Sequence, residues 1–205
     1  MQTEVSSDLN VGKYVTVETS EHVKSKSNRY INLLTTIEEE SLTTESFLDL
    51  VNTTPHDVIE EIEIRTRGQA ENPLWHTARR SRITASNFHD IKTRKPSTPA
   101  DNLVKKIRNE NDCEISTPAL KWGRKMEPIA KKKRYKATKK LKFKQNVTVM
   151  EKGLFVCSYC GFLGASPDGM IRTGSDVYLI EVKCPYKYRF QTSKVLARIK
   201  RFVVT

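Results

Sequence analysis

The sequence of 205 residues has few cysteines and glycines and no long apolar run. Its four cysteines stand at uneven spacings, unlike the dense pattern of a disulfide-stapled secreted domain, so we expect a reducing compartment. Eight glycines are too few for a collagen-like fibre. No segment approaches the roughly eighteen apolar residues of a membrane-spanning helix. The first residues lack the basic start and apolar stretch of a secretory signal. We therefore expect an intracellular protein with no membrane partner.

Basic residues are abundant and unevenly distributed. The chain has 36 Lys and Arg against 24 Asp and Glu, a formal net charge of +12. Residues 1–67 contain 13 acidic and 6 basic side chains, a net of −7, whereas residues 68–205 contain 11 acidic and 30 basic ones, a net of +19. Because a basic intracellular protein most often meets nucleic acid, we expect the second part to contain the working domain.

The acidic part also differs in its apolar pattern. Residues 1–28 have few apolar residues and no clear period, which predicts disorder. Residues 29–63 carry a weak helical pattern, which predicts one or two short helices, or a linker, at the edge of the main domain. We therefore expect an acidic N-terminal arm or linker over 1–63, partly disordered, and one domain over 64–205.

The basic part begins with helical patterns and ends with short β-prone segments. Helices are predicted over 75–82, 85–93 and 101–109, and from Pro118 toward Tyr135. We expect Phe88 and Ile91 to face inward and Pro128 to kink or split the last helix. Four β-prone segments follow at 147–149, 154–156, 169–171 and 177–182. Helices followed by a run of strands predict an α/β or α+β domain.

Two charged side chains stand in the last apolar strand. Alternation along a strand places Glu181 and Lys183 on one face, about 6.6 Å apart along the backbone. Such charges carry a desolvation cost that a metal ion and a phosphate would compensate. Asp168 follows the stiff Pro167 at a predicted strand start, thirteen residues before Glu181. That spacing suits a hairpin that returns Asp168 beside Glu181.

Pro-Asp, followed by Glu-x-Lys on a strand, is the pattern of the PD-(D/E)xK nucleases. Two carboxylates bind Mg²⁺, which can polarise a phosphoryl oxygen and lower the pKa of its bound water. A lysine can orient that water or offset charge in the transition state. A surface hairpin with an Asp turn and a Glu/Lys pair would have the same short pattern.

Four blocks carry a wider pattern. They lie at 66–86, which includes Trp75-x-x-x-Arg79 and Ile83-Thr84-Ala85-Ser86, at 119–128, which includes Trp122-Gly123-x-x-x-Glu127, at 163–169 and at 180–186. In their order and content they resemble the YqaJ-type viral recombinase domain of the phage lambda exonuclease family. The resemblance covers about residues 66–187 and implies a restriction-endonuclease-like core, a mixed central sheet flanked by helices.

The resemblance implies roles for single residues in catalysis. Asp168 and Glu181 would be metal ligands, and Lys183 would be the catalytic lysine. Glu127 would be a further carboxylate, supplied by a helix, that acts near the second ion or the water.

The resemblance also implies a phosphate site, in which Arg79, Ser86 and Ser166 hold the 5′-terminal phosphate of the digested strand. The sequence is consistent with this role, because we expect Thr84-Ala85-Ser86 to open a helix, and a helix N-terminus offers free N–H donors to an anion. An arginine beside it can give phosphate two parallel hydrogen bonds. The alternative for Arg79 is a solvated helix face, as for Arg80 and Arg82.

The implied function is that of a Mg²⁺-dependent DNA exonuclease, with Mn²⁺ as an alternative ion. It would digest double-stranded DNA from a free 5′ end in recombination or repair, and the family's ring-shaped trimers would allow a homo-oligomer. The alternative is a catalytically inactive DNA-binding remnant. Family members continue into further strands where only residues 188–205 follow here, with 194–204 reading as a basic amphipathic piece, so we expect a domain incomplete at its C-terminus.

Two further features leave alternatives open. Nine of the fourteen residues over 131–144 are basic, which fits contact with a DNA backbone, a nuclear-localisation signal or a solvated face. Cys157-x-x-Cys160 has no second pair at zinc spacing, which disfavours a structural zinc site. Cys184 follows the charged strand, where a packing role is favoured over that of a nucleophile.

Overall fold

The computed structural model describes residues 11–108, 117–141, 147–190 and 196–202, which form a mixed α/β fold. The α-helices in these ranges are α1 (Val11–Ile31), α2 (Leu33–Glu39), α3 (Thr44–Asn52), α4 (His56–Arg65), α5 (Pro73–Arg79), α6 (Phe88–Thr93), α7 (Asp101–Arg108) and α8 (Pro118–Leu141). The strands are β1 (Ile83–Thr84), β2 (Val147–Met150), β3 (Phe155–Val156), β4 (Leu163–Ala165), β5 (Gly169–Thr173), β6 (Asp176–Lys183) and β7 (Leu196–Phe202). Two short 3-10 helices are η1 (Gln69–Glu71) and η2 (Tyr186–Tyr188). No helix of the described ranges is long and apolar enough to cross a bilayer.

The larger cluster of buried apolar side chains lies among the N-terminal helices. In α4, spacings of three and four residues place Val58, Ile59 and Ile62 on one buried face. They pack with residues of α1, α2, α3 and α5, and with Leu154 and Val156 at β3. Strand β3 pairs antiparallel with β4, which pairs parallel with β1, so this cluster also supports the smaller sheet.

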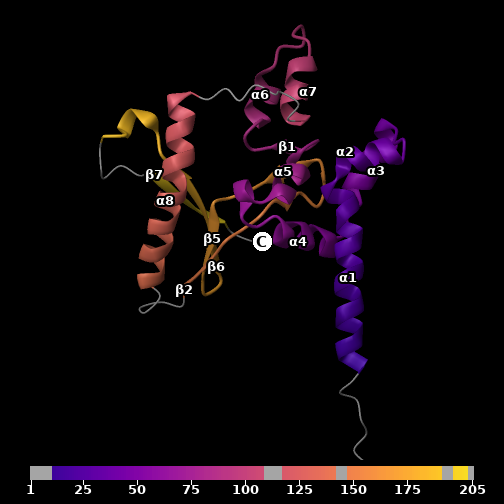
Figure 1. The fold of residues 1–205 in the computed structure, drawn as a ribbon, viewed down its shortest axis with the longest axis horizontal. Helices are drawn as coiled ribbons and strands as arrows, with labels where there is room; N and C mark the ends of the chain where they lie inside the picture. Colours follow the sequence, from indigo (N-terminus) through magenta and orange to yellow (C-terminus); the bar gives the residue numbers. More distant parts are fainter. Residues whose placement is uncertain (1–10, 109–116, 142–146, 191–195, 203–205) are drawn as a thin grey trace, which may run out of the picture.

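A second cluster lies between helix α8 and the larger sheet. This sheet has the order β2-β5-β6-β7, and every neighbouring pair is antiparallel. Ala130 of α8 is buried against Ile171 of β5 and Ile180 and Val182 of β6. In Figure 1, α8 runs along this sheet on one side of the molecule, and α1 stands on the other side. Each cluster therefore packs one of the two sheets against helices. The chain passes between the sheets more than once, because β2 belongs to the larger sheet, β3 and β4 to the smaller one and β5 to the larger one again.

Helix α1 begins within the segment for which the sequence pattern predicts disorder, and that expectation stays a prediction. Disorder is expected through residue 28, but α1 begins at Val11, and residues 1–10 lie outside the described residues. The buried residues Tyr30 and Ile31 lie at the C-terminal end of α1, where they belong to the larger cluster. Tertiary packing thus stabilises a helix whose local period is weak. The expected start of the working domain at residue 64 stays a prediction.

Two local expectations for the second part are wrong, and both concern helix α6. Helix α6 begins at Phe88 instead of residue 85, and the Phe88 side chain is 51% exposed. Helix α8 is continuous through Pro128, so it is not split there, and the expected kink stays a prediction. On either side of Pro128, Trp122 contacts the ring of Tyr186, and Tyr135 packs against the second cluster. The C-terminal tail contains β7, which pairs with β6, so β6 is not an edge strand.

Arg82 is buried, which contradicts the expectation of a solvated face. Only 1% of the residue is exposed, and its guanidinium donates hydrogen bonds to the carbonyls of Ala78, Tyr30 and Gly161, the last two at 2.7 and 3.1 Å. Burial lowers the pKa of Arg82 to about 10. One side chain therefore ties α1, α5 and the turn before β4 together.

Candidate functional site

The hairpin of β5 and β6 positions the predicted catalytic residues. Gly169 pairs with Ile180 across the hairpin, so Asp168 lies beside the C-terminal part of β6. The main-chain N–H of Val182 donates a 2.6 Å hydrogen bond to Oδ2 of Asp168. The hairpin that the spacing between Asp168 and Glu181 predicts is confirmed.

Glu181 and Lys183 lie together on the exposed face of β6. Their neighbours Ile180 and Val182 are 0% and 1% exposed, as strand alternation predicts. Nζ of Lys183 lies 2.7 Å from Oε1 of Glu181, and both side chains are about half exposed. Although burial acts to lower it, the carboxylate of Glu181 raises the pKa of Lys183, so the ammonium stays protonated at neutral pH.

Asp168 lies in a less polar environment than an ordinary surface carboxylate. Burial raises the pKa of Asp168, and the nearby charge of Glu181 acts in the same direction. The hydrogen bond from Val182 and the charges of Lys131 and Lys183 act against this rise. Two carboxylates therefore share one electrostatic environment, in which a bound cation would stabilise both charges.

One face of α8 lies over this hairpin. Glu127, Lys131 and Tyr135 follow one another at intervals of four residues, which places them on the same side of the helix. The charge of Glu127 acts on Lys183, the charge of Lys131 acts on Asp168, and the Tyr135 hydroxyl donates a hydrogen bond to the carbonyl of Asp168. The structure thus brings the four predicted catalytic side chains into one region.

The donor set of this region suits a hard divalent cation. In the described part of the chain, no three His, Cys, Asp or Glu side chains are close enough together to hold a metal ion. Mg²⁺ is usually bound by one or two carboxylates with waters and substrate phosphates, so it needs no such group. Asp168 and Glu181 therefore fit Mg²⁺ as a pair, whereas a closed structural zinc site would need four ligands.

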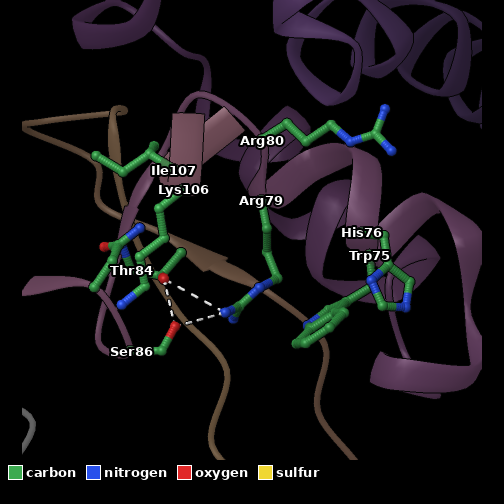
Figure 2. A pocket seen from close by; sticks show the side chains of 9 residues that line it. Trp75, His76, Arg79, Arg80, Thr84, Ser86, Lys106 and Ile107 are labelled. Carbon is green, nitrogen blue, oxygen red and sulfur yellow. Dashed lines mark hydrogen bonds between the residues drawn. The ribbon is translucent and has the colours of Figure 1, made fainter. Parts of the chain in front are cut away.

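A separate pocket of about 240 Å³ lies between α5, the segment after β1 and α7. Its lining includes Arg79, Ser86 and Lys106. Nη2 of Arg79 donates a 2.8 Å hydrogen bond to Oγ of Ser86 and a longer one, 3.4 Å, to the Thr84 hydroxyl. Figure 2 shows Arg79 extending toward both hydroxyls, whereas Arg80 points away from them. A cation and two hydroxyls thus share one small pocket.

The indole of Trp75 forms one wall of the pocket and holds Arg79 in place. The Cζ atom of Arg79 lies 4.2 Å from the centre of the Trp75 ring, a cation–π contact (Figure 2). Burial lowers the pKa of Arg79, but the ordinary pKa of arginine lies so far above neutral pH that the side chain keeps its charge. The pocket therefore contains a pre-oriented guanidinium, which suits an anion with several oxygens.

Ser166 connects the pocket to the hairpin. Nε1 of Trp75 donates a 2.8 Å hydrogen bond to Oγ of Ser166, which lies two residues before Asp168. Nε2 of Gln69 donates a 2.7 Å hydrogen bond to the carbonyl of the intervening Pro167. Arg79 and Ser86 are thus in direct contact, and Ser166 reaches them through the indole.

The helix N-terminus lies later than expected, at the N-cap Asn87, which also lines the pocket. Helix α6 begins only at Phe88, and the Asn87 side chain accepts the 2.7 Å hydrogen bond of the Thr84 N–H. The Ser86 hydroxyl contacts Arg79 instead of capping a helix. The donors to an anion are therefore side chains, because residues 84–87 form a turn between β1 and α6.

Three residues of this region were not assigned a role from the sequence. Gln69 lies in the first block and donates a hydrogen bond to the carbonyl of Pro167, but no periodic pattern or motif spacing in the sequence predicts this contact. Trp75 packs against the larger cluster and also contacts Arg79. Tyr135 is eight residues after Glu127, so helical spacing could have placed it at the same face.

Two sequence features remain to be placed in the structure, the other basic residues of α8 and the cysteines. Lys132, Lys133 and Lys136 are exposed on α8, whereas Lys142 and Lys144 lie outside the described residues. Cys157 and Cys160 are free thiols, and Cys184 packs against the second cluster, as expected.

Comparisons with known proteins point to one family. Residues 74–201 match the YqaJ-like viral recombinase domain. The chain is 27% identical over 135 residues to an alkaline nuclease of Human herpesvirus 6B (strain Z29), covering 62% of this chain and 25% of that protein. It is 28% identical over 150 residues to a shutoff alkaline exonuclease of Alcelaphine herpesvirus 1 (strain C500), covering 66% of this chain and 30% of that protein. The chain thus spans less than a third of either relative.

A solved structure is similar as well. The crystal structure of LHK-Exo in complex with dAMP has a TM-score of 0.39 and 31% sequence identity, covering 56% of this chain and 54% of that one. The domain match, which covers more than half of the 205 residues, confirms the resemblance noted in the sequence. The chain belongs to the YqaJ-like viral recombinase domain family, in the same wider lambda exonuclease family as the herpesvirus alkaline nucleases.

Proposed function

We propose that the chain is a Mg²⁺-dependent DNA exonuclease that digests double-stranded DNA from a 5′ end, in recombination or repair. The observation that carries this proposal is the gathering of Asp168, Glu181 and Lys183 on one hairpin beneath the Glu127 face of α8. The names of two relatives, alkaline nuclease and shutoff alkaline exonuclease, support the same reaction class.

The carboxylates have the first role in this proposal. Asp168 and Glu181 would hold the ion, with the Asp168 carboxylate oriented by the Val182 N–H. Mg²⁺ bound there supplies Lewis-acid stabilisation of a phosphoryl oxygen and a more acidic water. Because its pKa is raised, Lys183 serves as a protonated donor to the attacking water or to the transition-state oxygens, and not as a base. Glu127 lies on the neighbouring helix face, where a carboxylate can accept a proton from water.

The pocket at Arg79 gives the proposed enzyme its preference for DNA ends. A terminal 5′ phosphate has more charge and more free oxygens than an internal phosphodiester, so it suits a guanidinium with two adjacent hydroxyls. Ser166 lies near this group and two residues from Asp168. A phosphate held at Arg79 would therefore place the first nucleotides of its strand beside the Asp168 hairpin.

An assay on linear double-stranded DNA tests the proposal. We expect nucleotide release with Mg²⁺ and none with EDTA, and loss of release in Asp168→Ala and Lys183→Ala. Arg172→Ala, on the exposed part of β5, is the matched control and should retain activity. DNA binding without cleavage by folded wild-type protein, with Mg²⁺ and Mn²⁺ alike, would contradict the enzyme and favour an inactive DNA-binding remnant.

A further inference from the structure

From the third residue after Lys183, the chain forms a partly exposed row of aromatic and basic side chains that the proposed reaction does not use. The Cζ atom of Arg189 lies 4.1 Å from the ring centre of Tyr186 and 4.4 Å from that of Phe190. The guanidinium is therefore placed between two aromatic rings. Its Nη1 donates a 3.2 Å hydrogen bond to the Tyr186 carbonyl, which limits its movement.

The row is anchored at one end and open at the other. The ring of Tyr186 contacts that of Trp122 on α8 edge to face, with centroids 6.4 Å apart. At the other end, Phe190 is 84% exposed. Exposing a large apolar ring to water is unfavourable, and the ring at the open end of this row suits a ligand with a flat face.

The charge around the row favours an anionic ligand. The segment 186–190 contains Lys187 and Arg189 and no acidic residue. Within the described residues, Arg189 forms no ion pair with a carboxylate, and Lys187 lies over the Tyr188 ring at 4.8 Å. Flat faces joined to repeated negative charges are the chemistry of unpaired nucleotides, whose bases stack on aromatic side chains while basic groups meet the phosphates.

The place of the row in the fold connects it to the catalytic hairpin. Tyr186 follows Lys183 by three residues, and Trp122 precedes Glu127 by five residues on α8, about 7.5 Å along the helix axis. A strand that leaves the hairpin in this direction would meet Tyr186 first and Phe190 last. In the interior of a duplex, stacking on both faces leaves no base free to stack on such a ring.

We propose that Tyr186, Arg189 and Phe190 form a stacking site for unpaired nucleotides of single-stranded DNA beside the catalytic hairpin. The site deepens the proposed function, on which its DNA substrate rests. It would receive the strand that loses its partner as the complementary strand is digested. Phe190 is the outermost ring, so it supplies the face on which the first base stacks.

Fluorescence anisotropy of a labelled twelve-nucleotide oligo(dT) in EDTA tests the site without cleavage. We expect Phe190→Ala in the full chain to weaken binding at least about five-fold, the lower end of what base–aromatic stacking contributes. Phe190→Trp should retain the wild-type affinity. Phe190→Leu keeps an apolar side chain but has no aromatic face, and it should bind as weakly as Phe190→Ala.

The matched control is Tyr159→Ala, which removes a ring of the same 84% exposure from the turn between β3 and β4. It should bind oligo(dT) like the wild type, and circular dichroism checks the folding of each variant. The stacking site is contradicted if the wild type does not bind oligo(dT), if Phe190→Leu binds like the wild type, or if Tyr159→Ala weakens binding equally. Because EDTA removes catalysis from this assay, a failure to cleave duplex DNA with Mg²⁺ would count against the proposed function alone.

Discussion

The hydroxyl of Tyr135 donates a hydrogen bond to the main-chain carbonyl of Asp168, which joins α8 to the residue that directly precedes the β5–β6 hairpin. A Cβ atom at Gly169 would collide with this hydroxyl, so the close approach of helix and hairpin requires glycine there. Because Glu127 lies on the same face of α8, the contact fixes the separation between the helix carboxylate and Asp168. Tyr135 is therefore a positioning residue, which does not itself touch the substrate in the proposed reaction.

Tyr135→Phe should lower the rate of DNA digestion by about ten-fold and leave the fold intact. The variant loses one hydrogen bond, about 1 kcal/mol of stability, but it also loosens the position of Asp168. The measurement is kcat as a function of Mg²⁺ concentration, in which we expect a higher metal requirement. Tyr178→Phe is the matched control, because its hydroxyl contacts Asp176 at 3.2 Å, at the turn end of the hairpin and away from Asp168 and Glu181. An unchanged metal requirement in Tyr135→Phe would contradict a positioning role.

Arg79→Lys should remove the preference for 5′-phosphorylated ends. Lysine retains the positive charge but not the planar fork that contacts Ser86 and stacks on Trp75. We expect digestion of 5′-phosphorylated DNA to slow about ten-fold and to approach the rate on DNA with a 5′ hydroxyl. The same change at the exposed Arg172 should alter neither rate. Equal slowing on both kinds of end would mean that the pocket does not recognise the terminal phosphate.

Arg82→Met should destabilise the protein by at least about 3 kcal/mol, because it leaves three buried carbonyls without their donor. Arg80→Met, two residues earlier and exposed, should change the free energy of unfolding by less than about 0.5 kcal/mol. Urea unfolding followed by circular dichroism gives both values. Similar midpoints for the two variants would exclude Arg82 as the link between α1 and the turn before β4.

Glu63 should make stability depend on pH. Burial acts to raise the pKa of Glu63, but hydrogen bonds from Arg67, at 2.7 Å, and from the Gly153 N–H, at 2.9 Å, outweigh it and lower the pKa. Because the folded-state pKa lies below the unfolded one, this stabilisation is complete above the unfolded pKa and is lost as the pH falls through the folded pKa.

Glu63→Gln should therefore cost about 2 kcal/mol of unfolding free energy at pH 7, and the difference from wild type should shrink below about pH 4. Chemical unfolding at several pH values measures the difference in unfolding free energy between the variant and the wild type. Glu60→Gln, on the exposed side of the same helix, is the control and should have little effect at pH 7. A constant difference across this pH range would exclude a role for the Glu63 charge.

The β5–β6 hairpin was predictable because the sequence patterns that indicate it are local. Alternation in β6 separates Glu181 and Lys183 from buried Ile180 and Val182, and the short spacing from Asp168 leaves a hairpin as the simplest connection. The mixed α/β class followed from helical patterns preceding β-prone segments. These features depend on residues that are close together in the sequence.

The features that sequence reasoning missed depend on distant contacts. Nothing near Arg82 indicates that Tyr30 and Gly161 will supply carbonyls to its guanidinium. Likewise, α1 has a weak period and is stabilised by the cluster at its C-terminal end. The segment after β1 contains good capping residues, but Ser86 bonds to Arg79 instead, so the helix starts later. In each case tertiary packing overrides a local preference.

Direct metal binding tests the central claim, that Asp168 and Glu181 form one cation site. The measurement is isothermal titration calorimetry of Mn²⁺ into the wild type, Asp168→Asn and Glu181→Gln, each of which removes one charge and keeps the side-chain shape. We expect Mn²⁺ to bind to the wild type and either substitution to weaken binding at least about ten-fold. Equal Mn²⁺ affinity in all three proteins, or no binding by the folded wild type, would contradict it.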